Sequence, residues 1–100
     1  MSAYVIAQYD VVDPKAYESY VAGVRPLLQK HGAELLAADH ESDAWEGRKP
    51  GVTVVLKFDS EKAAREWYND PAYGPVKQIR LNSTKNGTLA LVKEFKMPPK

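Results

Sequence analysis

The stretch from residue 51 to residue 71 constrains the fold more than any other part of the sequence. Residues 52–58 are apolar or β-branched apart from Lys57, and turn-forming residues stand on either side of them. Such a run is typical of a well-buried strand. A helix is expected to begin directly afterwards, because Ser60 or the aspartate before it can accept a hydrogen bond from an early backbone N–H. Apolar residues up to Trp67 then follow at helical spacing, so a central strand leads straight into an amphipathic helix.

The N-terminal third of the chain predicts a strand, a helix and a second strand. Residues 3–11 alternate between two faces, as in a strand. Asp13-Pro14 supplies an N-cap and a first-turn proline for a helix over residues 14–31, which Gly32 terminates in the left-handed conformation. A second strand begins at residue 33 and runs irregularly to Glu46, so we expect it to be bent or bulged.

The remaining elements complete a β-α-β-β-α-β order. The loop over residues 47–51 is expected to close an antiparallel hairpin onto the central strand. After the second helix, apolar residues at three-residue spacing from Tyr73 indicate a further short helical piece, which fades from Asn82 onward. Asn86-Gly87 is interpreted as a turn, and residues 88–95 as the last strand.

This order of elements has one ordinary solution when crossovers are right-handed: a ferredoxin-like α+β fold, with a four-stranded antiparallel sheet and the helices on one face. We expect one domain over residues 1–95 and a flexible C-terminal tail over residues 96–100. The strands carry apolar side chains on both faces, which indicates that the second face is also covered. A second copy of the chain is the simplest cover, so we predict a homodimer.

Composition excludes several classes of partner. The chain has 14 Lys and Arg residues against 13 Asp and Glu, so its net charge favours neither nucleic acid nor an anionic membrane. It has no cysteine, which removes disulfides, thiol nucleophiles and thiolate metal sites. No apolar run approaches the ~20 residues of a transmembrane helix, and no signal peptide is recognised at the start. We therefore expect a cytoplasmic protein without nucleic-acid or membrane partners.

Several short stretches, in their order and spacing, resemble one family over nearly the whole chain. They are the opening strand with Asp13-Pro14 and Tyr17–Tyr20, the strand ending in Phe58-Asp59-Ser60, and residues 63–73 followed by Arg80. The family is the domain of unknown function 1330, within the superfamily of dimeric α+β barrels. The resemblance implies the ferredoxin-like dimer and a ligand between helices and sheet. The wider superfamily includes cofactor-free monooxygenases, isomerases, decarboxylases and haem-binding enzymes, so the fold alone does not assign a reaction.

The candidate ligand-binding residues are aromatic and polar side chains expected near a cavity between helices and sheet. They are Gln8, Tyr17, Tyr20, His31, Trp67, Tyr68, Tyr73 and Arg80. All but Gln8 have a structural alternative: packing for the aromatic residues, capping of the first helix for His31, and an ion pair with Asp10 or Glu34, or simple exposure, for Arg80. As a ligand anchor, the Arg80 guanidinium would hold a small carboxylate in a bidentate pair at the mouth of the cavity.

Two classes of function remain open, and the sequence does not identify a catalytic residue. The first is a small enzyme without a bound cofactor that acts on a small organic acid or aromatic compound. The second is a non-catalytic binding or stress-related homodimer. A pocket with convergent polar groups would favour the first, and a packed interior the second. Asp39-His40-Glu41 carries metal-competent groups, but they alternate in direction and lack a second histidine at helical spacing, so we expect no metal or other cofactor.

Overall fold

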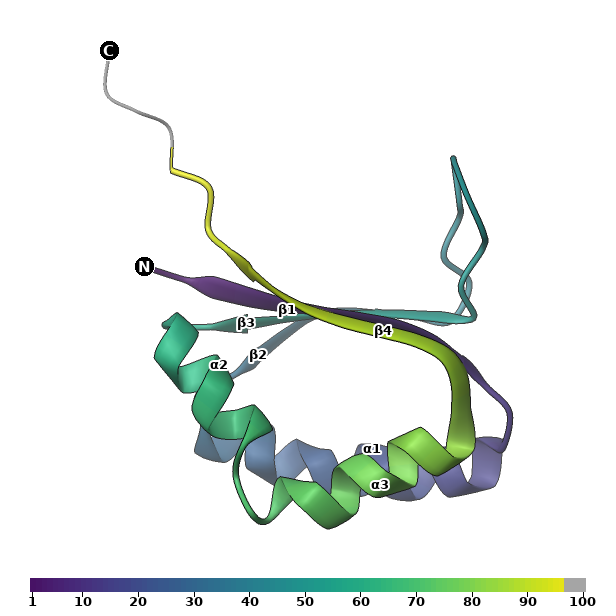
Figure 1. Ribbon diagram of the computed structural model, residues 1–100, viewed down its shortest axis with the longest axis horizontal. Coiled ribbons are helices and arrows are strands. Elements are labelled where there is room, and N and C mark those ends of the chain that lie inside the picture. The colour runs from purple at the N-terminus through teal and green to yellow at the C-terminus, as the bar shows by residue number, and fades with distance from the viewer. Residues whose placement is uncertain (97–100) are drawn as a thin grey trace.

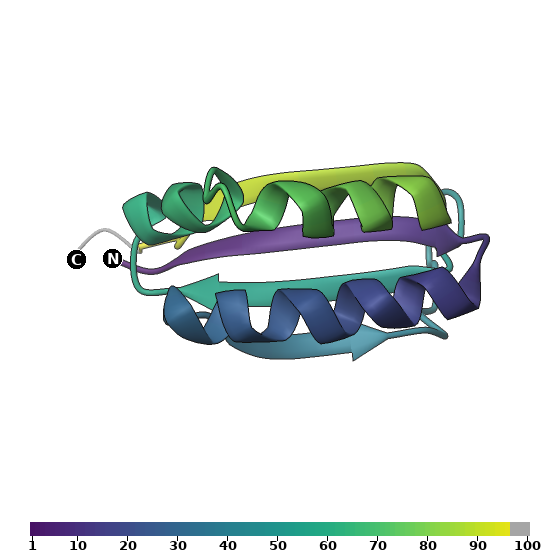
Figure 2. The same ribbon diagram turned by 90° about the horizontal axis from the view of Figure 1, so that it is seen from below.

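A computed structural model describes residues 1–96 of the chain. Its elements are β1 (Ala3–Val11), α1 (Pro14–Lys30), β2 (Glu34–Asp39), β3 (Val52–Phe58), α2 (Glu61–Tyr68), α3 (Tyr73–Ser83) and β4 (Thr84–Lys93). The strands form one antiparallel sheet in the order β2-β3-β1-β4, and all the helices lie on one face (Figures 1 and 2). The predicted ferredoxin-like fold is confirmed. Of the tail predicted for residues 96–100, residues 97–100 lie outside the described part of the chain.

The helix ends follow the local signals of the sequence. The side chain of Asp13 accepts a hydrogen bond from the backbone N–H of Ala16 at 3.2 Å, and Ser60 Oγ accepts one from Ala63 at 3.0 Å. Both are N-caps, which satisfy backbone donors that lack a partner in the first turn. At the other end of α1, His31 is the C-cap and Gly32 follows with φ +70°, the left-handed conformation that glycine adopts without strain.

The second strand is shorter than the sequence predicts. Its predicted bulge is present, as a register shift between Leu35 and Ala37, but β2 ends at Asp39 instead of running to Glu46. The Asp39 side chain accepts a hydrogen bond from the backbone N–H of Glu41 at 2.8 Å. This local turn competes with strand pairing, so residues 40–51 form a long connection.

The last strand begins earlier than the sequence predicts. The expected turn at Asn86-Gly87 is instead an irregularity within β4, which starts at Thr84. Asn86 adopts φ 56°, and the pairing with β1 shifts register between Gln8 and Asp10. One residue in the left-handed region absorbs the bulge and lets the strand continue.

The core lies between the sheet and the helices. Phe58, Trp67 and Tyr73 are fully buried there, with the Trp67 ring 4.6 Å from that of Tyr73 and 5.6 Å from that of Phe58. Helices α1 and α3 pack side by side over the sheet (Figure 2). At their contact, a Cβ on Gly23 would stand 3.2 Å from a methyl group of Val76, so glycine permits this close approach.

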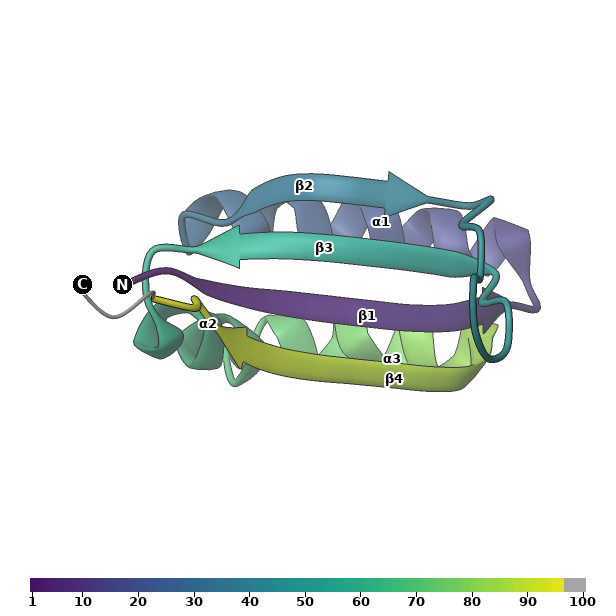
Figure 3. The same ribbon diagram turned by 90° about the horizontal axis from the view of Figure 1, so that it is seen from above.

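No helix of residues 1–96 lies on the opposite face of the sheet (Figure 3). Strand register arranges its side chains in three rows across the sheet, with a central row that is wholly apolar. The rows are Glu34–Lys57–Tyr4–Val92, Ala37–Val55–Ile6–Ala90 and Asp39–Thr53–Gln8–Thr88. An uncovered apolar patch of this kind on a sheet marks an interaction surface.

Candidate functional site

Four tyrosines converge between the helices and β1. Tyr9 comes from β1, Tyr17 and Tyr20 from α1, and Tyr73 from the start of α3, and all four are buried. The hydroxyls form two pairs: Tyr9 with Tyr17 at 2.6 Å, and Tyr20 with Tyr73 at 3.0 Å. Each hydroxyl therefore has a partner away from bulk water, which is what buried polar groups require.

Arg80 is the charged residue of this cluster. It lies in the last turn of α3, where the hydroxyls of Ser83 and Thr84 donate to its carbonyl at 3.3 and 2.7 Å. Its guanidinium carbon is 5.9 Å from the ring centres of both Tyr9 and Tyr20. Arg80 is only 5% exposed, and its Nε is buried without a hydrogen-bond partner among the residues that the structure describes. The positive charge of Arg80 therefore lies close to the rings of Tyr9 and Tyr20.

No carboxylate among residues 1–96 forms an ion pair with Arg80. Asp10, one of the two acidic partners considered from the sequence, instead accepts hydrogen bonds from Arg48, the backbone of Gly51 and Asn86. Arg80 is also buried rather than placed at a cavity mouth. A buried cation without a counter-ion is costly, which distinguishes it from an ordinary structural arginine.

Burial sets the protonation of the cluster. It raises the pKa of Tyr9, with a further contribution from the hydrogen bond to Tyr17. Burial likewise raises the pKa of Tyr20, together with the nearby Tyr73 oxygen. Burial alone would lower the pKa of Arg80, but the phenol oxygens of Tyr73 and Tyr20 outweigh it, and the net direction is upward. Tyr9 and Tyr20 are therefore neutral hydrogen-bonding groups beside a charged guanidinium.

A cavity of about 260 Å³ lies between α1 and the sheet, beside this cluster. Tyr9, Tyr17 and Tyr20 form part of its wall, and Arg25 and Gln29 line it from the exposed side of α1. The rest of the lining is apolar: Ala7, Val21, Val24, Leu28, Ala33, Leu35, Ala38, Val54 and Leu56. Arg80 and Tyr73 stand behind the tyrosine wall and are not part of the lining. A mostly apolar cavity with a few convergent polar groups is the usual form of a small-molecule site.

The structure brings only some of the predicted site residues together. Tyr17 and Tyr20 line the cavity, and Tyr73 and Arg80 support it from behind. Gln8 lies on the uncovered face of the sheet, where its amide donates to Thr53 Oγ1 at 3.4 Å. It faces away because Ala7 and Tyr9, its neighbours in the strand, face the helices.

Trp67 and Tyr68 lie outside the cavity between α1 and the sheet. They line a separate hollow of about 290 Å³ between α2 and the strands β1 and β4. The Trp67 indole nitrogen is buried without an acceptor, and the Tyr68 ring carries the ammonium of Lys77 at 4.5 Å from its centre. These two aromatic residues therefore belong to the core and surface around α2.

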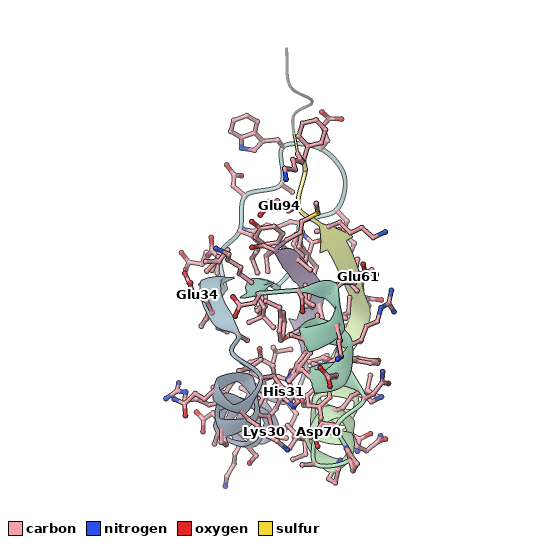
Figure 4. All side chains as sticks on the ribbon, turned by 90° about the vertical axis from the view of Figure 1, so that its left-hand side faces the viewer. Lys30, His31, Glu34, Glu61, Asp70 and Glu94 are labelled. Atoms are coloured by element: carbon pink, nitrogen blue, oxygen red, sulfur yellow. The ribbon has the colours of Figure 1, made fainter. Side chains whose placement is uncertain are left out.

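His31 links the end of α1 to Asp70, in the turn between α2 and α3 (Figure 4). Its Nε2 lies 2.8 Å from Asp70 Oδ2, and Lys30 Nζ donates to the same oxygen at 2.9 Å. Asp70 Oδ1 accepts from the backbone N–H of Ala72 at 2.9 Å. These contacts tie the end of α1 to the turn between α2 and α3, and they leave His31 outside the cavity lining.

Tyr9 and His40 lie near the cavity but were not among the candidate ligand-binding residues of the sequence analysis. Tyr9 completes the tyrosine cluster, and the alternation of β1 places it on the same face as Val5 and Ala7, which is the signal that identifies it. The His40 ring lies 6.4 Å from that of Tyr17 in an edge-to-face arrangement. The sequence analysis considered His40 only as a metal-competent group, because the connection after β2 brings it to α1 only in the folded chain.

Among residues 1–96, no three His, Cys, Asp or Glu side chains gather closely enough to hold a metal ion. Nor does the described part of the chain contain a helix of the length and apolar character needed to span a membrane.

Solved structures share this fold at low sequence identity. A protein of unknown function from Rhodopseudomonas palustris superposes with a TM-score of 0.81 at 15% identity, covering 96% of this chain and 84% of that chain. A dimeric ferredoxin-like protein of unknown function from Jannaschia sp. CCS1 gives 0.71 at 10% identity, covering 94% and 100%. SnoaB, described as a cofactor-independent oxygenase from Streptomyces nogalater, gives 0.62 at 15% identity, covering 99% and 98%.

These likenesses confirm the ferredoxin-like fold, and several of the similar structures are described as dimeric. No curated protein matches the sequence significantly. The model of one family, described as a domain of unknown function (DUF1330), matches residues 2–95. Because that match spans nearly the whole chain, the protein belongs to the DUF1330 family.

Proposed function

We propose that this protein is a homodimer that binds a small organic acid, or an aromatic compound with an acidic or carbonyl group, in the cavity between α1 and the sheet. The observation that carries the proposal is Arg80, a buried guanidinium without an acidic partner in the described chain, directly behind the tyrosines of the cavity wall.

The ligand class follows from charge and hydrogen bonding. The positive charge of Arg80 makes the tyrosine end of the cavity favourable for an anion or a carbonyl oxygen, because charges act strongly where water is excluded. The phenol hydroxyls of Tyr9, Tyr17 and Tyr20, which form part of the wall, can donate hydrogen bonds to such a group. The apolar remainder of the cavity suits a hydrocarbon or aromatic body. At about 260 Å³, the cavity volume lies just below the ~300–1,000 Å³ typical of ligand sites, so the ligand is small.

The cavity supports binding better than acid–base turnover. Its described lining holds phenols, one guanidinium and one amide, but no carboxylate or imidazole. Burial raises the pKa of Tyr9 and of Tyr20, so neither phenol is suited to act as a base near neutral pH. The oxygenase activity described for SnoaB belongs to that protein, and a shared fold does not transfer it.

The uncovered apolar sheet face and the dimeric description of similar structures support the homodimer. A sheet with apolar residues on both faces requires cover on both. In a two-fold dimer, the same face of each copy meets the other, which closes the assembly.

A thermal-shift screen of small carboxylic acids and phenols tests the binding proposal. Arg80→Met should melt at or above the wild-type temperature without ligand, because an apolar side chain removes the cost of an unpaired buried charge. The same variant should lose the shift produced by acids, corresponding to a loss of ~1–3 kcal/mol in binding. Arg80→Lys, which keeps the positive charge beside the cavity wall, should keep most of that shift.

Arg65→Met, which changes an exposed arginine of α2, is the matched control and should keep the acid-induced shift. Equal shifts in wild type and Arg80→Met, or an Arg80→Met protein that merely melts early, would return Arg80 to a structural role.

A further inference from the structure

Trp45 is an exposed tryptophan in the loop between two strands of the sheet. It lies in the connection between β2 and β3, residues 40–51, and it is 91% exposed. Tryptophan offers a large apolar surface and is enriched at the centres of protein interfaces. A single exposed apolar side chain is common on any protein, so the case depends on how the loop that carries Trp45 is built.

The loop is anchored at its base and free at its tip. On one side, Thr53 Oγ1 donates to Ser42 Oγ at 3.0 Å. On the other, Asp10 accepts hydrogen bonds from Arg48 and from the backbone N–H of Gly51. The bonds from Asn86 and Arg48 lower the pKa of Asp10 to about 2, so its carboxylate stays charged and holds the base together. The connection is therefore held in place at both ends while Trp45 contacts solvent.

The loop projects on the side of the sheet that has no helices. In Figure 1 it rises from one end of the sheet, opposite the helical layer, and the segment after β4 leaves the other end on the same side. That segment carries Phe95, which is 78% exposed, and the backbone N–H of Glu94 donates to the carbonyl of Ser2 at 3.1 Å. Two apolar projections thus flank the uncovered sheet face, whose central row is Ala37–Val55–Ile6–Ala90.

We infer that the connection over residues 40–51 is a clasp for a second copy of this chain, with Trp45 buried against the partner at the edge of the sheet-to-sheet contact. The inference rests on the proposed homodimer and adds the contact that secures it. A copy related by a two-fold axis carries the same face and the same loop, so each Trp45 docks once and the assembly closes.

A second copy suits this surface better than other partners do. Residues 40–51 carry Glu41, Asp43 and Glu46 against Arg48 and Lys49, so the loop offers no net positive charge to a nucleic acid or an anionic membrane. The surface between the two projections is a flat row of small aliphatic side chains, which suits another sheet packed face to face.

Fluorescence quenching by acrylamide, measured together with sedimentation velocity, tests the clasp. The chain has two tryptophans and Trp67 is buried, so the difference between wild type and Trp45→Phe reports on Trp45. We expect Trp45 to be shielded from acrylamide, with emission at shorter wavelength, at concentrations where the dimer is populated. Ile6→Glu, which places a charge in the central row of the sheet face, should make Trp45 accessible.

The second measurement is the affinity of the two copies for each other. Trp45→Ala should weaken the dimer at least tenfold, whereas Lys49→Ala, an exposed residue of the same loop, should leave it unchanged. A stable dimer with an accessible Trp45 and unchanged affinity in Trp45→Ala would overturn the clasp and leave the homodimer intact. A protein that stays monomeric would overturn both, and a Trp45 shielded in the monomer would show that the loop folds onto its own chain.

Discussion

At the scale of single residues, the tyrosine hydroxyls illustrate how a buried polar group depends on its partner. Tyr20 and Tyr73 lie far apart in the sequence, yet their hydroxyls are 3.0 Å apart in the core. Neither residue type is unusual in a core, but a phenol oxygen away from water requires a hydrogen bond. The pair therefore fixes how α1 and α3 sit relative to one another.

Tyr73→Phe should lower the free energy of unfolding by ~1–3 kcal/mol, because it leaves the Tyr20 hydroxyl without its partner. The double variant Tyr20→Phe/Tyr73→Phe should recover much of that loss, since both polar groups are gone. Urea denaturation of the wild type, Tyr20→Phe, Tyr73→Phe and the double variant gives the four free energies of unfolding that a double-mutant cycle needs. Tyr68→Phe, at a partly exposed position, should stay within about 0.5 kcal/mol of wild type. A double variant whose loss equals the sum of the single losses would show that the two hydroxyls do not depend on each other.

At the scale of elements, Asp70 connects helices that are adjacent in space but not in sequence. Its carboxylate accepts hydrogen bonds from residues at the end of α1 and from the backbone of the turn before α3 (Figure 4). The hydrogen bond with His31, followed by those from Ala72 and Lys30, holds the pKa of Asp70 below its ordinary value. The charged form is therefore favoured by folding.

This shift predicts a pH dependence. A carboxyl group whose pKa is depressed in the folded state contributes stability above its unfolded pKa of about 3.9, and that contribution is lost as the pH falls toward the folded pKa. The urea midpoints of wild type and Asp70→Asn should therefore differ most near neutral pH, and the difference should shrink progressively below about pH 5. A difference that stays constant down to the acid transition would show that the ionisation of Asp70 is not coupled to folding.

At the scale of the whole molecule, one face of the sheet is left uncovered by the described part of the chain. Helices cover one face, and the other carries an apolar central row with no cover from its own described chain (Figure 3). A face-to-face homodimer would bury on the order of 1,200–2,000 Å² or more in total, which is the size of a stable interface.

Ile6→Glu should convert the dimer to a monomer at micromolar concentration, because it buries an unpaired charge at the centre of the interface. Leu81→Glu introduces the same change at an exposed position on α3, on the helical side, and should leave the dimer intact. Sedimentation velocity distinguishes the two outcomes. If Ile6→Glu and wild type sediment alike, the sheet face is not the interface.

The sequence by itself determined the features that arise from local interactions. The spacing of apolar residues, the caps at Asp13 and Ser60, and the left-handed Gly32 predicted the order of elements, and handedness then selected the ferredoxin-like arrangement. These signals act over a few residues, so they can be read along the chain. The ends of β2 and β4 were missed because side-chain and bulge geometry in the folded sheet outweighed local turn propensity.

The candidate site was decided by tertiary structure. The sequence placed tyrosines and Arg80 near a cavity, but it did not show which hydroxyls form hydrogen-bonded pairs. Nor did it show that Arg80 is buried without an acidic partner among residues 1–96, while Asp10 accepts a hydrogen bond from Arg48 of the loop. Gln8 and Tyr9 are neighbours in β1 and face opposite sides, and only the packing of α1 and α3 over the sheet determines that Tyr9 meets Tyr17. Such contacts join side chains from different elements, and their geometry depends on how those elements pack against one another.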